Sequence, residues 1–390
     1  MFDIKGKAYV IVKHTHFESY GTPETELVRF LKGQASSILY IRHPFPEAKK
    51  IPLNTTIVEY SPTGDIIRET KAPMIRGNNL LFYIKDVFFS VYYVLKSGRK
   101  YDVYISADNL NTLAGLILRI LGRVSNVVYY VIDFTPVRFT NRLLNAIYQA
   151  INKICCYHAD VIWNVSGAMI EGRERIGIRR DFSASQITVP LGCNFHGIRR
   201  KPIDKINRYD IVYFGSLCEE HGPGLILEAL PGIVKHIPNA RVIFVGDGVL
   251  REQMTVRAEL NGIMSHVQFA GFIESDEEVY QILTSCGLAL ATYPPGETTY
   301  KLFSDPGKVK IYLACGLPVL ITDVPPIASV IQGKGAGKIV EYETAGLTGA
   351  VCDILLDTER HKRMREESVR LAAEYDWKTV WQRTFDSMEL

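Results

Sequence analysis

The stretch YDIVYFGSLCEEHGPGLILEAL, residues 209–230, reads as one strand, one turn and one helix. Its first six residues are mostly β-branched or aromatic, which is typical of a buried strand. The chain then turns at Gly215 and Ser216 and enters a helix near Gly222 and Pro223. Glycine at such a turn lets the backbone approach a ligand closely, and the first amides of the helix can bind an anion. Any strand-to-helix turn shares these features, so the stretch alone decides only the local fold.

The same alternation of strand and helix extends in both directions along the chain. Strand-like runs occupy 8–14, 37–43, 101–106, 127–133 and 160–166 in the first half, and 240–248, 267–272, 288–293 and 317–322 after the opening stretch. Strands that alternate with helices predict parallel sheets covered by helices. Residues 55–70 break the pattern and predict a β-hairpin around Pro62, Thr63 and Gly64.

A chain of 390 residues is too long for one ordinary core, so we expect two domains. We place the first at 1–195, a linker at 196–207 and the second domain at 208–372. The last segment, 373–390, has large apolar residues at helical spacing. We expect it to pack back across the domain junction, or alternatively to belong to the core of the second domain alone.

The net charge of +3 conceals a basic first half and an acidic second half, roughly +10 and roughly −7. The basic half could meet an anionic membrane or a phosphate-bearing substrate, or it could be an ordinary solvated surface. The seven cysteines are scattered without a CxxC pair, which favours a reducing, cytoplasmic location, and the first residues lack the apolar core of a signal peptide. The apolar run 80–95 contains Lys85 and Asp86 and is short for a membrane span. It predicts either a buried helix or a segment that touches a bilayer from one side.

Five segments of the second half together resemble the C-terminal, nucleotide-sugar domain of family 4 glycosyltransferases (group 1). They are GSLCEEHGPGLILEAL, ARVIFVGDGVLREQM, VQFAGFIESDEEVYQIL, LALATYPP and GKVKIYLACGLPVLIT, in the family's order and spacing. The resemblance is close over about 208–390 and extends to the first half only in outline. It implies an α/β protein of the GT-B fold, with two Rossmann-like doubly wound domains that face a central cleft.

The resemblance also implies which residues contact the donor. Gly215, Ser216 and Gly222 would lie near the donor diphosphate. Ser216 and His221 stand where the family usually has two basic residues, although His221 can still donate a hydrogen bond to a phosphate. Lys308, at the start of the helix GKVKIYLA, could supply the missing cation.

Two glutamates that the family carries seven residues apart are absent here. Matching backwards from ACGLP places Phe303 and Ile311 at those two positions. The nearby Ser304, Asp305 and Glu297 are candidate replacements, and we favour Asp305. Asp305 is equally suited to cap the helix that follows Pro306.

Other candidate residues follow strand ends in both halves. In the first half, Asp133 could orient or deprotonate an acceptor hydroxyl, or simply cap a turn. The predicted catalytic residues are Asp133, Asp305 and Lys308. The predicted donor-binding residues are Gly21, Gly215, Ser216, His221, Gly222, Asp247, Phe272, Ile273, Ser304 and Gly307, and the acceptor-side candidates are Asp108, Asn109 and Arg138.

These features together predict an enzyme that moves a sugar from a nucleotide-diphosphate sugar to an acceptor hydroxyl, with retention of configuration implied by the family. No Asp-x-Asp anchors a metal and no G-x-G-x-x-G opens the first domain, so we expect neither a metal nor another cofactor. The partners would be the donor and a saccharide or lipid-linked acceptor, with no nucleic acid, in the cytoplasm or at the inner membrane face. The alternatives are a non-catalytic partner subunit that binds sugar nucleotides, and a sugar-nucleotide epimerase of the same fold.

Overall fold

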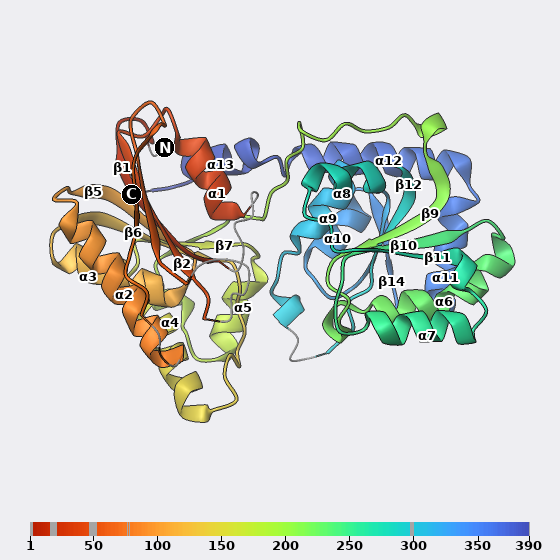
Figure 1. Ribbon diagram of the computed structural model, residues 1–390, viewed down its shortest axis with the longest axis horizontal. Coiled ribbons are helices and arrows are strands. Elements are labelled where there is room, and N and C mark those ends of the chain that lie inside the picture. The colour runs from red at the N-terminus through yellow and green to blue at the C-terminus, as the bar shows by residue number, and fades with distance from the viewer. Residues whose placement is uncertain are drawn as a thin grey trace. The chain divides into compact units, whose positions relative to one another are not determined.

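The computed structural model describes residues 3–15, 22–46, 53–75, 77, 79–296 and 300–389. It forms two compact units, each with its own sheet (Figure 1). The first unit comprises Met1–Pro190 with Val380–Leu390, and the second comprises Leu191–Thr379. The α/β class and the two Rossmann-like units that the sequence predicts are confirmed.

The first unit is built on an eight-stranded sheet in the order β4-β3-β2-β1-β5-β6-β7-β8. All neighbouring pairs from β2 to β8 in that order are parallel. The strands are β1 (Ala8–Thr15), β2 (Ser37–Pro44), β3 (Thr56–Tyr60), β4 (Ile66–Lys71), β5 (Tyr101–Ser106), β6 (Val124–Val131), β7 (Val161–Asn164) and β8 (Ser185–Thr188). The helices are α1 (Pro23–Leu31), α2 (Asn79–Lys96), α3 (Asn109–Ile120), α4 (Arg142–His158) and α5 (Ala168–Arg175).

The predicted hairpin is confirmed, because β3 and β4 pair antiparallel at the edge of this sheet. The sequence did not predict β8, a short strand of mostly polar residues that lies at the opposite edge. The predicted strand 127–133 is shifted in the structure, since β6 ends at Val131. Asp133 therefore lies in the loop after the strand, beyond the sheet's carboxyl edge.

The second unit has a six-stranded parallel sheet in the order β11-β10-β9-β12-β13-β14. Its strands are β9 (Asn207–Phe214), β10 (Arg241–Val245), β11 (Val267–Gly271), β12 (Cys286–Ala291), β13 (Val319–Thr322) and β14 (Gly337–Val340). Its helices are α6 (Pro223–His236), α7 (Arg251–Leu260), α8 (Asp276–Leu283), α9 (Gly307–Ala314), α10 (Ile327–Gly333), α11 (Thr344–Leu355) and α12 (Thr358–Ala373). Strand order reverses between β9 and β12, which is the doubly wound arrangement of the Rossmann fold.

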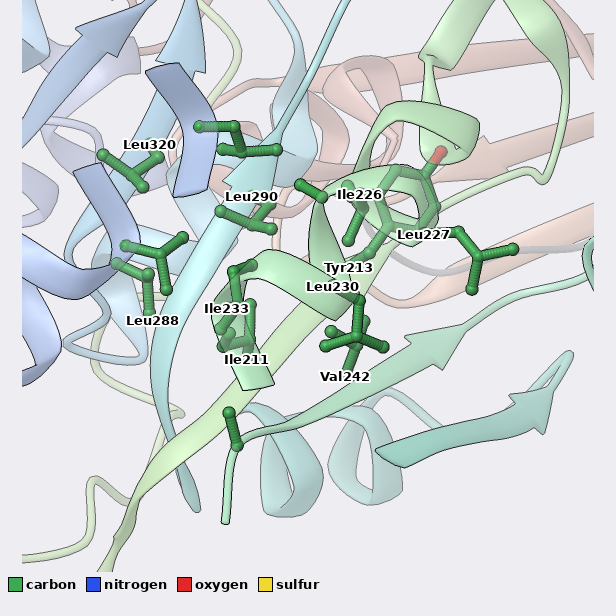
Figure 2. Close-up of a cluster of buried hydrophobic side chains, with 14 of the residues drawn as sticks. Ile211, Tyr213, Ile226, Leu227, Leu230, Ile233, Val242, Leu288, Leu290 and Leu320 are labelled. Atoms are coloured by element: carbon green, nitrogen blue, oxygen red, sulfur yellow. The ribbon is translucent and has the colours of Figure 1, made fainter. Parts of the chain in front are cut away.

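The core of the second unit explains why the opening stretch of sequence folds as it does. Ile211 and Tyr213 of β9 alternate onto one face of the sheet and pack with Ile226, Leu230 and further apolar residues of α6 (Figure 2). The helix can lie flat on the sheet because its apolar residues recur every three to four positions. This packing fixes the point at which β9 ends and α6 begins.

The last helix, α13 (Trp377–Asp386), contributes residues to both units. Trp377 packs against Gly192 in the second unit, and Trp381 and Phe385 contact Trp163 in the first. The segment expected as the linker, 196–207, falls inside the second unit. There the Arg200 side chain donates to the carbonyl oxygens of Ala314 and Phe195.

Candidate functional site

The carboxyl ends of β9 and β12 mark the point in the second unit where strand order reverses. In open α/β sheets ligands bind just beyond the strands at such a switch point. Two helices begin there, α6 after β9 and α9 on the chain that follows β12. The described side chains form no cap hydrogen bond at the first turn of either helix. Their first N–H groups are therefore available to an anion.

Gly222, which precedes α6, fits only as glycine. Its φ is 65°, in the left-handed region, and a Cβ at this position would lie 1.7 Å from the Thr292 carbonyl oxygen. Thr292 Oγ1 in turn donates a 2.8 Å hydrogen bond to the Gly222 carbonyl oxygen. The start of α6 is thus held directly against the end of β12, as the site requires.

Lys308, in the first turn of α9, points at the same place. Its Nζ lies 4.5 Å from the ring centre of Tyr213 and 5.0 Å from that of Tyr293. The residue as a whole is half-buried, but Nζ itself is shielded from solvent and has no hydrogen-bond partner in the part of the chain that the structure describes. Burial and the neighbouring Lys301 ammonium lower the pKa of Lys308 to about 7. A buried cation without an acceptor is costly, and a bound anion would supply one.

His221 lies edge-on to Tyr293, with the two ring centres 6.2 Å apart. Its Nδ1 is 3.3 Å from the Ser216 carbonyl oxygen. Burial, Lys308 and Lys301 together lower the pKa of His221 to about 4. The structure therefore brings Gly215, Ser216, His221, Gly222 and Lys308 together, and their contact with a donor diphosphate stays a prediction.

Asp305 is engaged elsewhere. One carboxylate oxygen pairs with the buried Lys310 ammonium, and the other accepts a 2.7 Å hydrogen bond from the Leu191 amide. The alternative interpretation as a helix cap does not hold, because the cap residue of α9 is Pro306 and no side chain caps it. The sequence did not indicate this pairing. A catalytic role for Asp305 stays a prediction.

The remaining donor candidates of the second unit occupy varied positions. Gly307 is the first residue of α9, and Ser304 is buried, with its hydroxyl donating to the Lys301 carbonyl oxygen. Asp247 forms an exposed ion pair with Arg251 at 3.1 Å. Phe272 is exposed just after β11, and Ile273 packs partly against the core.

The two positions at which the family carries glutamates are apolar in the structure as in the sequence. Phe303 is buried, and Ile311 packs against the core from α9. Gly21 and Glu297 lie outside the described residues.

The first unit has its own pocket, of about 400 Å³, beyond the carboxyl ends of β5 and β6. All four first-unit candidates that the structure describes line it, namely Asp108, Asn109, Asp133 and Arg138. The rest of the lining is mostly apolar and aromatic, including Tyr83 and Tyr148. Such a mixture is typical of sites for organic ligands.

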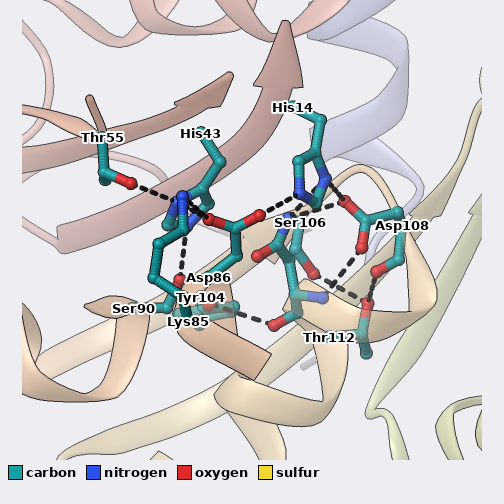
Figure 3. Close-up of polar contacts among 11 residues, drawn as sticks. His14, His43, Thr55, Lys85, Asp86, Ser90, Tyr104, Ser106, Asp108 and Thr112 are labelled. Atoms are coloured by element: carbon teal, nitrogen blue, oxygen red, sulfur yellow. Dashed lines mark hydrogen bonds and ion pairs between the residues drawn. The ribbon is translucent and has the colours of Figure 1, made fainter. Parts of the chain in front are cut away.

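His14 and Asp108, which line this pocket, belong to a largely buried polar network (Figure 3). His14 Nδ1 lies 2.9 Å from Asp108 Oδ2, and His14 Nε2 lies 3.0 Å from Asp86 Oδ2. Burial alone would lower the pKa of His14, but the carboxylates of Asp108 and Asp86 outweigh it and raise the pKa to about 10. His14 is therefore a permanent imidazolium near neutral pH.

Asp86, on α2, joins this network to two further buried groups. Lys85 Nζ lies 2.8 Å and His43 Nδ1 3.1 Å from Asp86 Oδ1. Burial lowers the pKa of His43, so this second imidazole stays neutral. Sequence reasoning missed His43 and Asp86 as parts of a site; the adjacent Lys85 and Asp86 within an apolar helix were the one available indication.

The architecture is that of the GT-B glycosyltransferases. The structure superposes on the crystal structure of Anabaena Alr3699/HepE in complex with UDP with a TM-score of 0.67, covering 97% of this chain and 99% of that one at 15% identity. At this identity the likeness shows the fold alone.

Residues 208–357 match the family model described as Glycosyl transferases group 1. A phosphatidyl-myo-inositol mannosyltransferase of Mycobacterium leprae is 24% identical over 50% of this chain and 50% of its own length. A GDP-mannose-dependent alpha-(1-6)-phosphatidylinositol dimannoside mannosyltransferase of Mycobacterium tuberculosis is 27% identical over 59% of this chain and 56% of its own. The matched part spans about half the length of these relatives.

Proposed function

We propose that the protein is a glycosyltransferase that moves a sugar from a nucleoside-diphosphate sugar to an acceptor hydroxyl. The observation that carries this proposal is the Lys308 ammonium, buried between two tyrosine rings at the switch point without an acceptor in the described structure. The group 1 match of the surrounding domain and the UDP in the HepE structure support a nucleoside diphosphate as the missing anion.

In the proposed reaction, negative charge grows on the diphosphate as its bond to the sugar breaks. The first amides of α6 and α9 and the Lys308 ammonium would stabilise this charge, each already in position before the reaction. These groups rather than a metal ion take the charge in our proposal. Retention of the sugar's configuration is part of it and rests on the family resemblance.

The acceptor would bind in the pocket of the first unit. Asp133 is exposed there and forms no hydrogen bond with another described residue, whereas the Asp108 carboxylate is occupied by His14 and Asn111. Glu24, the third carboxylate that lines the pocket, is buried. In our proposal the exposed Asp133 therefore orients the acceptor hydroxyl and receives its proton. We propose a saccharide or lipid-linked acceptor, handled on the cytoplasmic side of a membrane. The names of the two mycobacterial relatives, both of which act on phosphatidylinositol compounds, agree with this class.

Calorimetric titration of the purified chain with UDP, GDP and ADP, and with the matching nucleosides, tests the donor site. We expect one diphosphate to bind and Lys308→Met to weaken its affinity by about 2 kcal/mol or more, since the lysine makes a charge-assisted contact. Affinity for the nucleoside should change little. The control Lys334→Met removes an exposed lysine that pairs with Glu374 outside the site. Equal losses for diphosphate and nucleoside would reject the assignment.

Turnover of the identified donor then tests the transfer itself. Asp133→Asn should lower the rate of transfer to an acceptor at least about tenfold while donor affinity stays unchanged. Donor binding without any transfer, over a panel of saccharide and lipid-linked acceptors, would instead favour the non-catalytic partner subunit.

A further inference from the structure

Helix α2 has charged residues on its buried side and apolar residues on its exposed side, the reverse of an ordinary surface helix. Two of its three charged residues, Lys85 and Asp86, are buried and paired with each other. Its outward side carries an apolar stripe in which every member is between 38% and 59% exposed. The stripe consists of Leu80, Leu81, Ile84, Phe88, Tyr92 and Leu95 and runs the length of the helix. Surface helices normally present polar residues to water, so this stripe indicates a covered face.

Helix α4, which packs on α3 as α2 does (Figure 1), also carries exposed apolar residues. Leu143 is 70% exposed, and Leu144 and Ile147 of the same helix are also exposed. Val137, in the loop before α4, adds to them. We call the α2 stripe with these four residues the docking face.

The charges near the docking face are almost all positive. Exposed cations stand at the end of α2 (Lys96, Arg99, Lys100), before and at the start of α4 (Arg138, Arg142) and along it (Lys153). Across 79–159, a range that the structure describes, Asp133 is the one exposed carboxylate. An apolar face with a basic fringe is complementary to an anionic lipid surface, where apolar side chains enter the interface and cations meet the headgroups.

The docking face also borders the pocket of the first unit. Leu80 and Tyr83 of α2 and Leu144 and Ile147 of α4 line that pocket. A ligand held there by its polar part at Asp108 and Asp133 would thus have apolar side chains beside it that belong to the docking face. This continuity indicates what kind of acceptor the pocket takes.

We infer that the docking face binds the surface of an anionic bilayer, and that the acceptor is a lipid-linked molecule taken from that bilayer. The lipid-linked acceptor depends on the proposed transferase function, whereas the contact with the bilayer does not. Among the described residues no helix is long and apolar enough to cross a membrane, so contact through this face is peripheral. A second copy of the chain is a poorer occupant, because two such faces in contact would bring their fringes of cations together.

Cosedimentation with lipid vesicles tests the docking face without any need for activity. We expect the wild type to bind vesicles of phosphatidylcholine with phosphatidylglycerol and to bind vesicles of phosphatidylcholine alone weakly. Ile84→Glu with Phe88→Glu should lower the affinity about tenfold or more, since two exposed apolar groups that would enter the interface become charged. Replacing Lys96, Arg99 and Lys100 with glutamine should lower it on the order of a hundredfold and flatten its dependence on salt.

The matched control places the same two charges on exposed apolar residues of the second unit, Val249→Glu with Leu260→Glu, which are 86% and 81% exposed in the wild type. This variant should bind vesicles as the wild type does. Nucleoside diphosphate affinity, measured for every variant, confirms folding and keeps failure of the donor site distinct from failure of the docking face.

Two results would overturn the inference. One is equal binding by the wild type and Ile84→Glu/Phe88→Glu, or no binding to anionic vesicles by either. The other is a wild-type dimer in light scattering that these two substitutions make monomeric, which would assign the face to a second copy. For the acceptor, transfer to a water-soluble saccharide that is unaffected by vesicles and by these substitutions would reject a lipid-linked molecule.

Discussion

At the scale of single residues, Lys308 and Lys310 show how two lysines in the first turn of one helix take different roles. Lys310 is buried against the Asp305 carboxylate, which neutralises it within the protein. The Lys308 ammonium is buried against two aromatic rings, which offer a weak attraction but no hydrogen-bond acceptor. The Lys310–Asp305 pair is complete within the protein, whereas in our proposal a ligand supplies the missing partner of Lys308.

The pKa of Lys308 leads to a prediction about pH. The pKa is about 7 in the free protein, and a bound diphosphate would raise it because an adjacent anion favours the charged ammonium. Below pH 7 the lysine is charged before binding. Above pH 7 binding must take up a proton, so affinity should fall as pH rises, by up to about tenfold per pH unit.

Titrations of diphosphate between pH 7.5 and 9.5, a range chosen at roughly 0.5 to 2.5 units above that pKa, measure this effect. Repeating each titration in buffers with different ionisation enthalpies gives the number of protons taken up. Lys308→Met should lose most of the proton uptake and most of the pH dependence. If the variant takes up as many protons as the wild type, another group is responsible.

At the scale of elements, the junction of β9 and α6 depends on Gly222. Gly222→Ala would place a Cβ 1.7 Å from the Thr292 oxygen and would hold alanine at a φ of 65°. The strain in φ alone costs about 1–3 kcal/mol, and relief of the clash must move α6 away from β12. We expect a lower free energy of unfolding and a loss of diphosphate affinity, measured by urea denaturation and calorimetry.

Gly224→Ala, two residues further along α6, is the matched control. A Cβ there would have no atom within 4 Å of it in the described structure. Alanine is also the better helix former, so this variant should be as stable as the wild type or slightly more stable. Unchanged diphosphate affinity in Gly222→Ala would show that the start of α6 does not contact the anion.

Most helices and strands could be predicted from the sequence, because the residue pattern that identifies each one lies within its own segment. Part of the candidate sites could not be predicted. The run 209–214 could be recognised as a strand from its own residues, and the following glycines as a turn. Strand β14 was not predicted, because its sequence GKIV is short and follows a glycine-rich segment. The network around Asp86 was not predicted for a different reason. Its members His14, His43 and Asp86 come from β1, β2 and α2, and only the folded chain brings them together.

At the scale of the whole molecule, the division into two units assigns one substrate to each in our proposal. The unit with the Lys308 site, 191–379, belongs to the acidic half of the chain. The proposed anion site is therefore a local positive feature within a unit whose net charge is negative. The first unit, with the docking face, carries most of the net positive charge. The net charge of the first unit thus agrees with the proposed membrane contact. In our proposal, local geometry rather than net charge selects the donor phosphates in the second unit.

This division predicts where a nucleoside diphosphate will slow hydrogen exchange. A ligand at 100 times its Kd stabilises the structure that binds it by about 2.7 kcal/mol. The opening events that release the ends of β9 and β12 and the starts of α6 and α9 should therefore become rarer. We expect slower deuterium uptake in peptides covering 213–226 and 300–314, and unchanged uptake in 101–115 and 142–158, which surround the pocket of the first unit. Lys308→Met, at the same diphosphate concentration, should abolish the slowing. Protection confined to 101–115 and 142–158 would place the nucleotide in the first unit and would assign Lys308 a purely structural role, because a bound anion protects the amides it contacts wherever it lies.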